Sequence, residues 1–335
     1  QLTKEQDEIV LTIRMTAACL TIVGCLFIII SMIIFKKLRS MPSRLIFWLS
    51  CSSLITGCVN LLSPARDIEP ICYMQGLIMQ FSQQATFLWT CVIATNLFIV
   101  LVVRYKKVKL LEKWYHVFVW SYATGFALCP IFTHDYGIAG PWCWITDSFM
   151  GNVWRFACFY LPLFMYLIYV FVVYVIVAAV VRYTFSRISS KTPDQKKRDR
   201  RIINRLVAYP IIFFVLWVFP SINRIYGWAS GGNEVFWLFI LQSITAPSQG
   251  FCNALAYGLD SELRHRYKKL IMKKCCCCST ADMETGTSME TGADSRTEGG
   301  HRRRKHEISH RTNLMYLFEC IVCCKGAHSK IYDPV

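Results

Sequence analysis

Three arginines lie inside long apolar stretches of the chain, where a charged side chain is costly. They are Arg14, Arg155 and Arg224. All 21 Asp and Glu residues lie outside these stretches or at their edges, so no carboxylate within them neutralises the arginines. A guanidinium presents a planar fork of donors that matches a phosphate or a carboxylate. The chemistry that these residues could do is therefore the capture of an anion.

Two interpretations of these arginines remain open at the level of the sequence. An arginine near the end of a membrane-spanning helix can extend its guanidinium to the lipid headgroups, and we favour that for Arg14. For Arg155 and Arg224 we favour an inward-facing cavity, because residues such as Asn223 that suit a polar interior flank them. The residues that we predict to bind an anionic ligand are Arg14, Gln83, Arg155, Asn223, Arg224 and Gln242.

Other polar side chains recur at helical spacing along the apolar stretches. One stripe comprises Gln242, Thr245, Gln249 and Asn253, and another comprises Gln83, Thr86 and Thr90. Such residues often form hydrogen bonds between helices in membranes. We therefore assign the deeper Thr90 and Asn253 to helix packing, and the outer Gln83 and Gln242 to the ligand.

The stretches themselves predict a membrane protein. The chain is 54% hydrophobic and 17% charged, with a mean hydropathy of +0.37, and its charges cluster between the apolar runs. A helix needs about 20 apolar residues to cross roughly 30 Å of hydrocarbon, and six runs reach or nearly reach that length. We predict an all-α bundle of seven transmembrane helices within residues 1–259: Ile9–Phe35, Leu45–Leu62, Ile71–Val103, Tyr115–Phe132, Val153–Tyr183, Ile202–Trp228 and Val235–Leu259.

The distribution of Lys and Arg sets the predicted orientation. Four loops on one side are rich in them, while the other side has only Lys4 and Arg66. The rich loops are residues 36–44, 104–114, 184–201 and 260–274. Cytoplasmic loops carry such an excess, so we predict a multi-pass plasma-membrane protein with its N-terminus outside. The same bias explains the net charge of +16 without a nucleic-acid partner.

Two cysteines lie on the outer, oxidising side of the predicted membrane. Cys72 starts the third apolar run and Cys143 lies in the loop before the fifth. They are the only cysteines on that side, so we predict that they form a disulfide. Closing a loop of about 70 residues in this way could stabilise the fold by up to about 4 kcal/mol.

The last apolar run is followed by a basic, amphipathic stretch and four consecutive cysteines. Residues 260–278 predict an eighth helix that lies on the inner leaflet and contacts membrane lipids. Its candidate palmitoylation sites are Cys275, Cys276, Cys277 and Cys278, with a reduced cysteine-rich linker as the alternative. Residues 279–335 predict a disordered cytoplasmic tail, whose Ser and Thr residues suit regulation by phosphorylation, with a plain solvated tail as the alternative.

The absence of carboxylates from the apolar runs argues against several functions. Proton relays and ion-coupled transporters depend on intramembrane acids, and no inverted repeat of the transporter type is evident. None of the seven histidines is grouped as in a zinc site. We predict that the chain is not an enzyme and needs neither a metal nor a cofactor. A channel or transporter stays open as an alternative.

Two prolines in the sixth run predict a moving element. Pro210 and Pro220 each remove a backbone hydrogen bond and are expected to interrupt the helix. A pivot there would open a cleft on the cytoplasmic side. Arg205 and the pair Arg104 and Tyr105 would face such a cleft, and contact with lipid headgroups is the alternative for them.

Several motifs resemble the cyclic-AMP receptor-like family of G-protein-coupled receptors, known from slime moulds and often called class E. The matching stretches are CYMQG at 72–76, WCWI at 142–145, WRFACFYLPL at 154–163, FPSINRIYG at 219–227 and LQSITAPSQGFCNALAYG at 241–258. The chain departs from rhodopsin-like receptors, because it has neither a DRY triplet nor an Asn-Pro-x-x-Tyr motif.

The resemblance implies a receptor that senses an extracellular ligand, cyclic AMP in the slime-mould members, and activates a heterotrimeric G protein. It makes Arg155 and Arg224 the candidates for the phosphate of the ligand. The candidate G-protein-coupling residues are Arg104, Tyr105, Lys106 and Arg205. A receptor of the same fold for another anion or a lipid, with basal activity, is the alternative.

Overall fold

The computed structural model describes residues 3–35, 40–105, 107–187, 193–230, 235–258, 263–264 and 267–268. The chain divides into two units, Gln1–Leu263 and Arg264–Val335. Of the second unit, only Arg264, Tyr267 and Lys268 are described, and all three are helical. The predicted lipidation sites Cys275 to Cys278, the tail 279–335 and most of the predicted eighth helix therefore lie outside the described residues.

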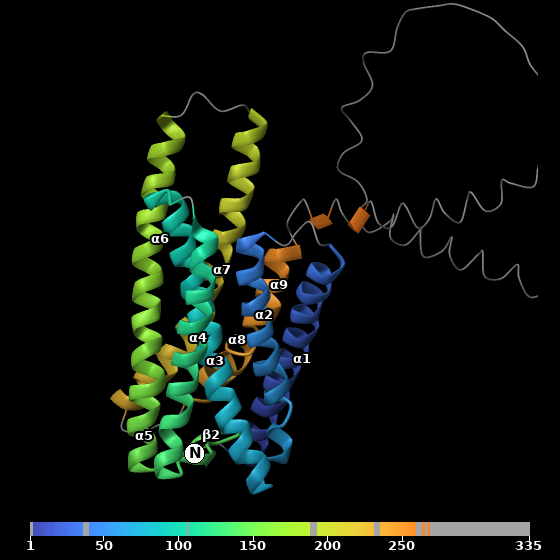
Figure 1. Ribbon diagram of the computed structural model, residues 1–335. Coiled ribbons are helices and arrows are strands. Elements are labelled where there is room, and N and C mark those ends of the chain that lie inside the picture. The colour runs from blue at the N-terminus through green and yellow to red at the C-terminus, as the bar shows by residue number, and fades with distance from the viewer. Residues whose placement is uncertain are drawn as a thin grey trace, which may run out of the picture. The chain divides into compact units, whose positions relative to one another are not determined.

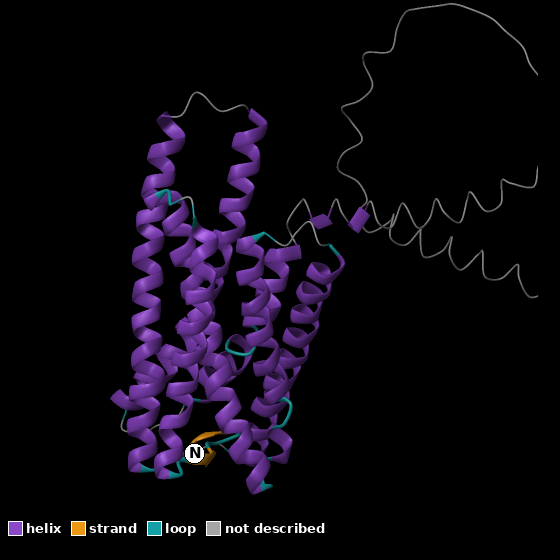
Figure 2. Cartoon of the chain, in the orientation of Figure 1, coloured by secondary structure: helices purple, strands orange, loops and turns teal. Residues whose placement is uncertain are grey.

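The first unit is a bundle of long helices with one small hairpin at the end that also holds the N-terminus (Figures 1 and 2). Its helices are α1 (Lys4–Ile34), α2 (Met41–Asn60), α3 (Glu69–Phe98), α4 (Glu112–Leu128), α5 (Phe149–Arg155), α6 (Leu161–Arg187), α7 (Pro193–Ala229), α8 (Phe236–Thr245) and α9 (Gln249–Gly258). Its strands are β1 (Tyr136–Ile138) and β2 (Cys143–Ile145), and two π-helical turns, η3 (Ile99–Val103) and η6 (Phe156–Tyr160), extend α3 and join α5 to α6.

Five helical segments are long and apolar enough to cross a membrane. They are Lys4–Ile34, Glu69–Val103, Val108–Thr133, Phe149–Val180 and Ala208–Gly227. The second and seventh predicted spans contain helices as well, but within the described residues those helices do not meet both criteria. The helical class of the prediction is confirmed, and the number of spans and their orientation stay predictions.

Helix α3 forms the centre of the bundle, because it packs against α2, α4, α6 and α7. The core beside it is aromatic. The rings of Phe87 and Trp217 lie 4.5 Å apart, edge to face, and both side chains are buried. Edge-to-face pairs of this kind add stability beyond their buried area, so this contact fixes α7 against α3.

The hairpin β1–β2 is held to α3 by covalent and close non-covalent contacts. The predicted disulfide between Cys72 and Cys143 is present, with an S–S distance of 2.04 Å. A Cβ on Gly76 of α3 would lie 2.8 Å from the ring of Tyr136, so glycine permits the close approach. The turn between the strands contains Gly140 at φ +84°, a conformation that L side chains rarely adopt.

A buried carboxylate organises the base of the hairpin. Asp135 accepts hydrogen bonds from the hydroxyls of Thr133, Thr146 and Ser148, the Thr146 bond measuring 3.1 Å. Burial alone would raise the pKa of Asp135, but these hydrogen bonds outweigh it and lower the pKa below its usual value. The ionised carboxylate therefore ties both ends of the hairpin together.

The seventh predicted span is not the single helix that the sequence predicted. It breaks between α8 and α9, where Pro247 lacks the backbone N–H that a continuous helix needs. Thr21 of α1 replaces the lost bonds, since its hydroxyl donates to the Pro247 carbonyl at 2.5 Å and accepts from the Phe251 N–H at 3.2 Å. A Cβ on Gly250 would lie 2.6 Å from the Cys25 sulfur, so glycine lets α9 pack closely on α1.

The sixth predicted span differs from its prediction in two ways. Most of the predicted loop 184–201 is helical, because α6 continues to Arg187 and α7 starts at Pro193. Both helices extend beyond the rest of the bundle at the end opposite the hairpin (Figure 1). Pro210 and Pro220 were expected to interrupt the helix, yet α7 runs through both. Neighbouring helices can accommodate the freed backbone groups of such prolines.

The predicted cytoplasmic residues are described only in part. Arg104 ends the turn η3 with a left-handed backbone, at φ 57°, and the adjacent Tyr105 is 43% exposed. Arg205 belongs to α7, while Lys106 lies outside the described residues.

Candidate functional site

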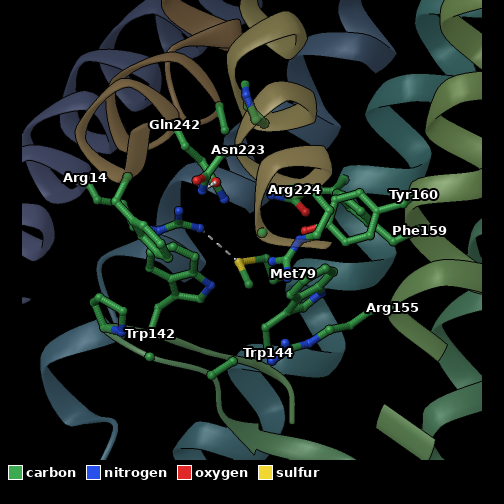
Figure 3. A pocket seen from close by; sticks show the side chains of 18 of the residues that line it. Arg14, Met79, Trp142, Trp144, Arg155, Phe159, Tyr160, Asn223, Arg224 and Gln242 are labelled. Carbon is green, nitrogen blue, oxygen red and sulfur yellow. Dashed lines mark hydrogen bonds between the residues drawn. The ribbon is translucent and has the colours of Figure 1, made fainter. Parts of the chain in front are cut away.

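A cavity of about 750 Å³ opens beneath the hairpin, between α1, α3, α7 and α8. All six residues predicted to bind a ligand line it: Arg14, Gln83, Arg155, Asn223, Arg224 and Gln242. They come from helices that are far apart in the sequence and converge only in the fold. Figure 3 labels all of them except Gln83. The three arginines play different parts in the cavity, because their partners differ.

Arg14 is fully engaged within the bundle. Its Nε donates to Asn60 Oδ1 at 2.8 Å, its second terminal nitrogen contacts the Met79 sulfur at 3.4 Å, and its guanidinium stacks 4.1 Å from the Trp142 ring. The side chain is only 3% exposed. The interpretation that Arg14 extends to the lipid headgroups is therefore wrong, because Asn60 and Trp142 offer it an amide and an aromatic face inside the protein.

Arg155 is paired with a carboxylate from the loop after β2. Its Nη1 forms an ion pair with Asp147, and its Nε and Nη2 donate to the Ile145 carbonyl at 2.8 and 2.6 Å. Within the described residues, Asp147 is therefore the carboxylate that neutralises Arg155, and it is not paired with Arg224. Since the Asp147 side chain is 79% exposed while that of Arg155 is 6% exposed, solvent reaches the pair from one side.

Arg224 is the least engaged of the three. Its guanidinium lies 4.8 Å from the centre of the Tyr160 ring (Figure 3). Its Nε is buried and has no hydrogen-bond partner. Within the described residues, no carboxylate comes within 4.0 Å of its guanidinium nitrogens. A cation in a cavity with a free donor can accept an anion without first losing an existing bond.

Amide side chains also line the cavity. Asn223 Nδ2 donates to Gln242 Oε1 at 2.6 Å and so joins α7 to α8. Gln83 of α3 lines the floor and is 8% exposed. Thr90, which we had assigned to packing between helices, instead donates to the Thr86 carbonyl of its own helix at 3.0 Å.

Aromatic residues that the sequence did not single out for the ligand form much of the remaining wall. They include Trp142, Trp144, Phe159, Tyr160, Trp217 and Phe239. The motif WCWI contains the first two, which alternate with Cys143, and only Trp144 belongs to strand β2. Trp144 is fixed by its indole N–H, which donates to Gln80 Oε1 at 3.0 Å.

The turn η6 brings Tyr160 to the cavity. Its backbone leaves the Cys158 carbonyl available, and the amide nitrogens of Gln80 and Gln84 donate to it at 3.0 and 2.8 Å. These two bonds from α3 stabilise a backbone shape that is uncommon in helices. Nothing in the sequence pattern marks a π-helical turn, so the place of Tyr160 could not be predicted.

The described residues that line the cavity carry a net positive charge. They include the three arginines and two carboxylates, Asp7 and Asp147. Asp7 lies 3.9 Å from Arg66, which also donates to the Gly140 carbonyl at 3.2 Å, so this pair fastens the tip of the hairpin to α1. The cavity therefore combines unneutralised positive charge with flat aromatic walls.

Comparisons with known proteins agree on one family. The sequence profile described as slime mold cyclic AMP receptor matches residues 1–285. "G-protein coupled receptor 1" of Arabidopsis thaliana is 31% identical over 269 residues, 78% of this chain and 82% of that protein. "Cyclic AMP receptor-like protein A" of Dictyostelium discoideum is 30% identical over 271 residues, with coverage of 81% and 69%. "Cyclic AMP receptor 1" of the same organism is 27% identical over 316 residues, with coverage of 88% and 78%.

Proposed function

Because this chain belongs to the slime mold cyclic AMP receptor family, we propose that it is a receptor for extracellular cyclic AMP or a closely related nucleotide and that it activates a heterotrimeric G protein. The family consists of multi-pass membrane receptors, and the bundle has five helices long and apolar enough to cross a membrane. The relatives are receptors rather than enzymes, which fits the prediction that this chain has no catalytic function.

The unpaired Nε of Arg224 is the observation that carries this proposal. A buried guanidinium donor without a partner is unfavourable, and the phosphate of a nucleotide would supply two acceptors to its fork. Arg155 lies close enough to Arg224 for the two charges to repel each other. A bound phosphate between them would remove that repulsion, so both arginines would gain from one anion.

The aromatic and amide residues suit the rest of a nucleotide. A purine presents a flat face to indole and phenol rings and hydrogen-bonding edges to amides. Trp142, Trp144 and Tyr160 supply the rings, while Gln83 and the pair Asn223–Gln242 supply the amides. Arg14 contributes positive charge and also positions Trp142 by stacking on it.

The proposed signal is a shift between two states of the bundle. The ligand draws the outer ends of the helices that carry Arg155 and Arg224 together, and α7 then pivots near Pro210 and Pro220. The G protein would bind the opposite end, at Arg104, Tyr105, Lys106 and Arg205. Palmitoylation of Cys275 to Cys278 and regulation by a receptor kinase and arrestin belong to the same proposal.

Equilibrium binding of labelled cyclic AMP to the purified full-length receptor tests the ligand. We expect saturable binding by the wild type and a large loss of affinity in Arg155→Ala and Arg224→Ala. Arg44→Ala is a matched control that should keep the affinity, because Arg44 is a partly exposed arginine that pairs with Glu112, and neither residue lines the cavity. If the wild type binds and both cavity variants keep its affinity, the phosphate site is wrong.

Absence of binding by the wild type would instead show that the family ligand does not transfer to this chain. The same cavity would then favour another anion or a lipid phosphate, with G-protein activation measured as the readout. An ion-flux assay on reconstituted protein addresses the rival class, since a channel would conduct and a receptor would not.

A further inference from the structure

A second, smaller cavity lies directly below the floor of the first. Gln83, Trp217 and Ala246 line both cavities, so these side chains separate them. The space open to the centre of a water molecule is about 10 Å³, which is close to the minimum that one water requires. The cavity is therefore large enough for one water and too small for a nucleotide or an organic anion.

Two polar atoms of the residues that line this small cavity have no hydrogen-bond partner in the protein. They are Nε2 of Gln249, on α9, and the hydroxyl oxygen of Ser53, on α2. The two residues are 5% and 3% exposed. The orientation of Gln249 is set by its other end, because its Oε1 accepts a hydrogen bond from the Trp217 indole N–H at 3.1 Å. Its amide nitrogen is therefore left to donate elsewhere.

The types of the free atoms decide which occupant fits. An amide N–H needs an acceptor, whereas a metal cation offers none and would be repelled. No carboxylate or other charged side chain is among the described residues that line the cavity. The Thr86 hydroxyl donates to the Ser82 carbonyl and keeps lone pairs that can accept, while the Thr56 hydroxyl is shared between the Ser52 carbonyl and the Ser82 hydroxyl. An occupant that both accepts and donates is required, and water does both.

We propose that this cavity holds one ordered water, which accepts from Gln249 and bridges it to Ser53. The water links α2 to α9 across the break at Pro247, and through Gln249 it positions Trp217. Since Trp217 also forms part of the ligand cavity, the bridge connects the floor of that cavity to α2. The proposal does not depend on which ligand the receptor binds.

The direct test is a structure of the full-length receptor in lipid nanodiscs, at a resolution that shows ordered waters. We expect a solvent peak within hydrogen-bond distance of Gln249 Nε2 and Ser53 Oγ. An empty cavity would overturn the proposal, and so would a peak surrounded by oxygens at the shorter distances of a cation. Thermal unfolding in sodium and in choline chloride gives an independent check, because a rise in the midpoint specific to sodium would also contradict a water.

Two serine variants test the proposed water bridge, because the direction in which the unfolding midpoint changes depends on whether the water is present. If Ser53 binds a water, Ser53→Ala breaks that bond and lowers the unfolding midpoint by a few degrees. If the cavity is dry, the same change removes an unpaired hydroxyl and leaves the midpoint unchanged or higher, which would overturn the proposal. Ser50→Ala is the matched control, since buried Ser50 lies one turn away and donates to the Ile46 carbonyl at 2.8 Å.

Discussion

Two walls of the ligand cavity differ in how firmly their side chains are held. We call the hairpin, which includes Trp144, together with Arg14 and Arg155 the hairpin wall. We call Asn223 and Arg224 the α7 wall. Each residue of the hairpin wall has partners in the protein, including Asn60, Gln80 and Asp147. On the α7 wall, Arg224 keeps a free donor and rests on one aromatic ring.

The difference separates arginines that also stabilise the fold from an arginine whose donor is free for a ligand. The same guanidinium chemistry stabilises the fold where the protein supplies acceptors, and it is left for an anion where the protein does not. Removing a residue of the hairpin wall should therefore lower stability first. Removing Arg224 should lower affinity with little change in stability.

Breaking the disulfide should have the largest effect on the hairpin wall. The double change Cys72→Ala and Cys143→Ala opens a loop whose ends are 71 residues apart. We expect the free energy of unfolding to fall by about 4 kcal/mol in the chain-entropy model and ligand binding to be lost with the hairpin. Thermal unfolding in detergent measures the first and radioligand binding the second. Cys19→Ala, at an exposed free cysteine, should change neither, and equal midpoints in all three proteins would contradict the prediction.

Changing Arg224, on the α7 wall, should lower ligand affinity and leave stability almost unchanged. We expect Arg224→Ala to weaken binding of cyclic AMP by about 100-fold, which corresponds to the loss of one charge-assisted contact of roughly 3 kcal/mol. Arg224→Lys should restore part of the affinity, because it keeps the charge and loses the fork. The unfolding midpoint should stay within about one degree in both variants. A large fall in the midpoint with unchanged affinity would erase the distinction between the walls.

Asn60 allows the hairpin wall to be weakened without touching a ligand contact. Asn60→Ala removes the acceptor of the Arg14 Nε and leaves a buried guanidinium donor unpaired, which we expect to cost about 2 kcal/mol of stability. In an Arg14→Met background the same change should cost much less, because the partner is already gone. The wild type, the two single variants and the double variant form a double-mutant cycle, and their free energies of unfolding give the coupling energy between Asn60 and Arg14. If the two losses of stability simply add, the two residues do not stabilise each other.

The smallest expected effect is the pH dependence of the hairpin base. The pKa of Asp135 is lower in the folded protein than its ordinary value of about 4. Its ionised form therefore adds stability at pH values above that value, and the contribution disappears as the pH falls through the lower folded value. We expect the midpoint to fall less steeply below pH 4 in Asp135→Asn than in the wild type. Parallel pH profiles for the two proteins would contradict this.

The helices and the polar residues that line the cavity could be predicted from the sequence better than the partners with which those residues pair. Apolar runs marked every long helix. The absence of carboxylates from these runs pointed to the three arginines, and the polar residues beside them and at helical spacing added three amides that line the same cavity. The partner of Arg155 could not be predicted, because Asp147 reaches it through the geometry of the hairpin. Likewise, the inward direction of Arg14 depends on Asn60 of another helix. The break at Pro247 was signalled by the proline, but the replacement of its bonds by Thr21 was not.

The π-helical turn between α5 and α6 also determines the direction in which each later side chain of the helix points about the helix axis. In a regular helix, Arg155 and Tyr160 would point about 140° apart, since each residue turns the helix by about 100°. The wider turn reduces that angle, and both residues line the cavity. Deleting one residue from Phe156–Tyr160 would therefore rotate the rest of the helix relative to α3. Insertions and deletions in this short stretch would change which residues meet the ligand without altering any of them.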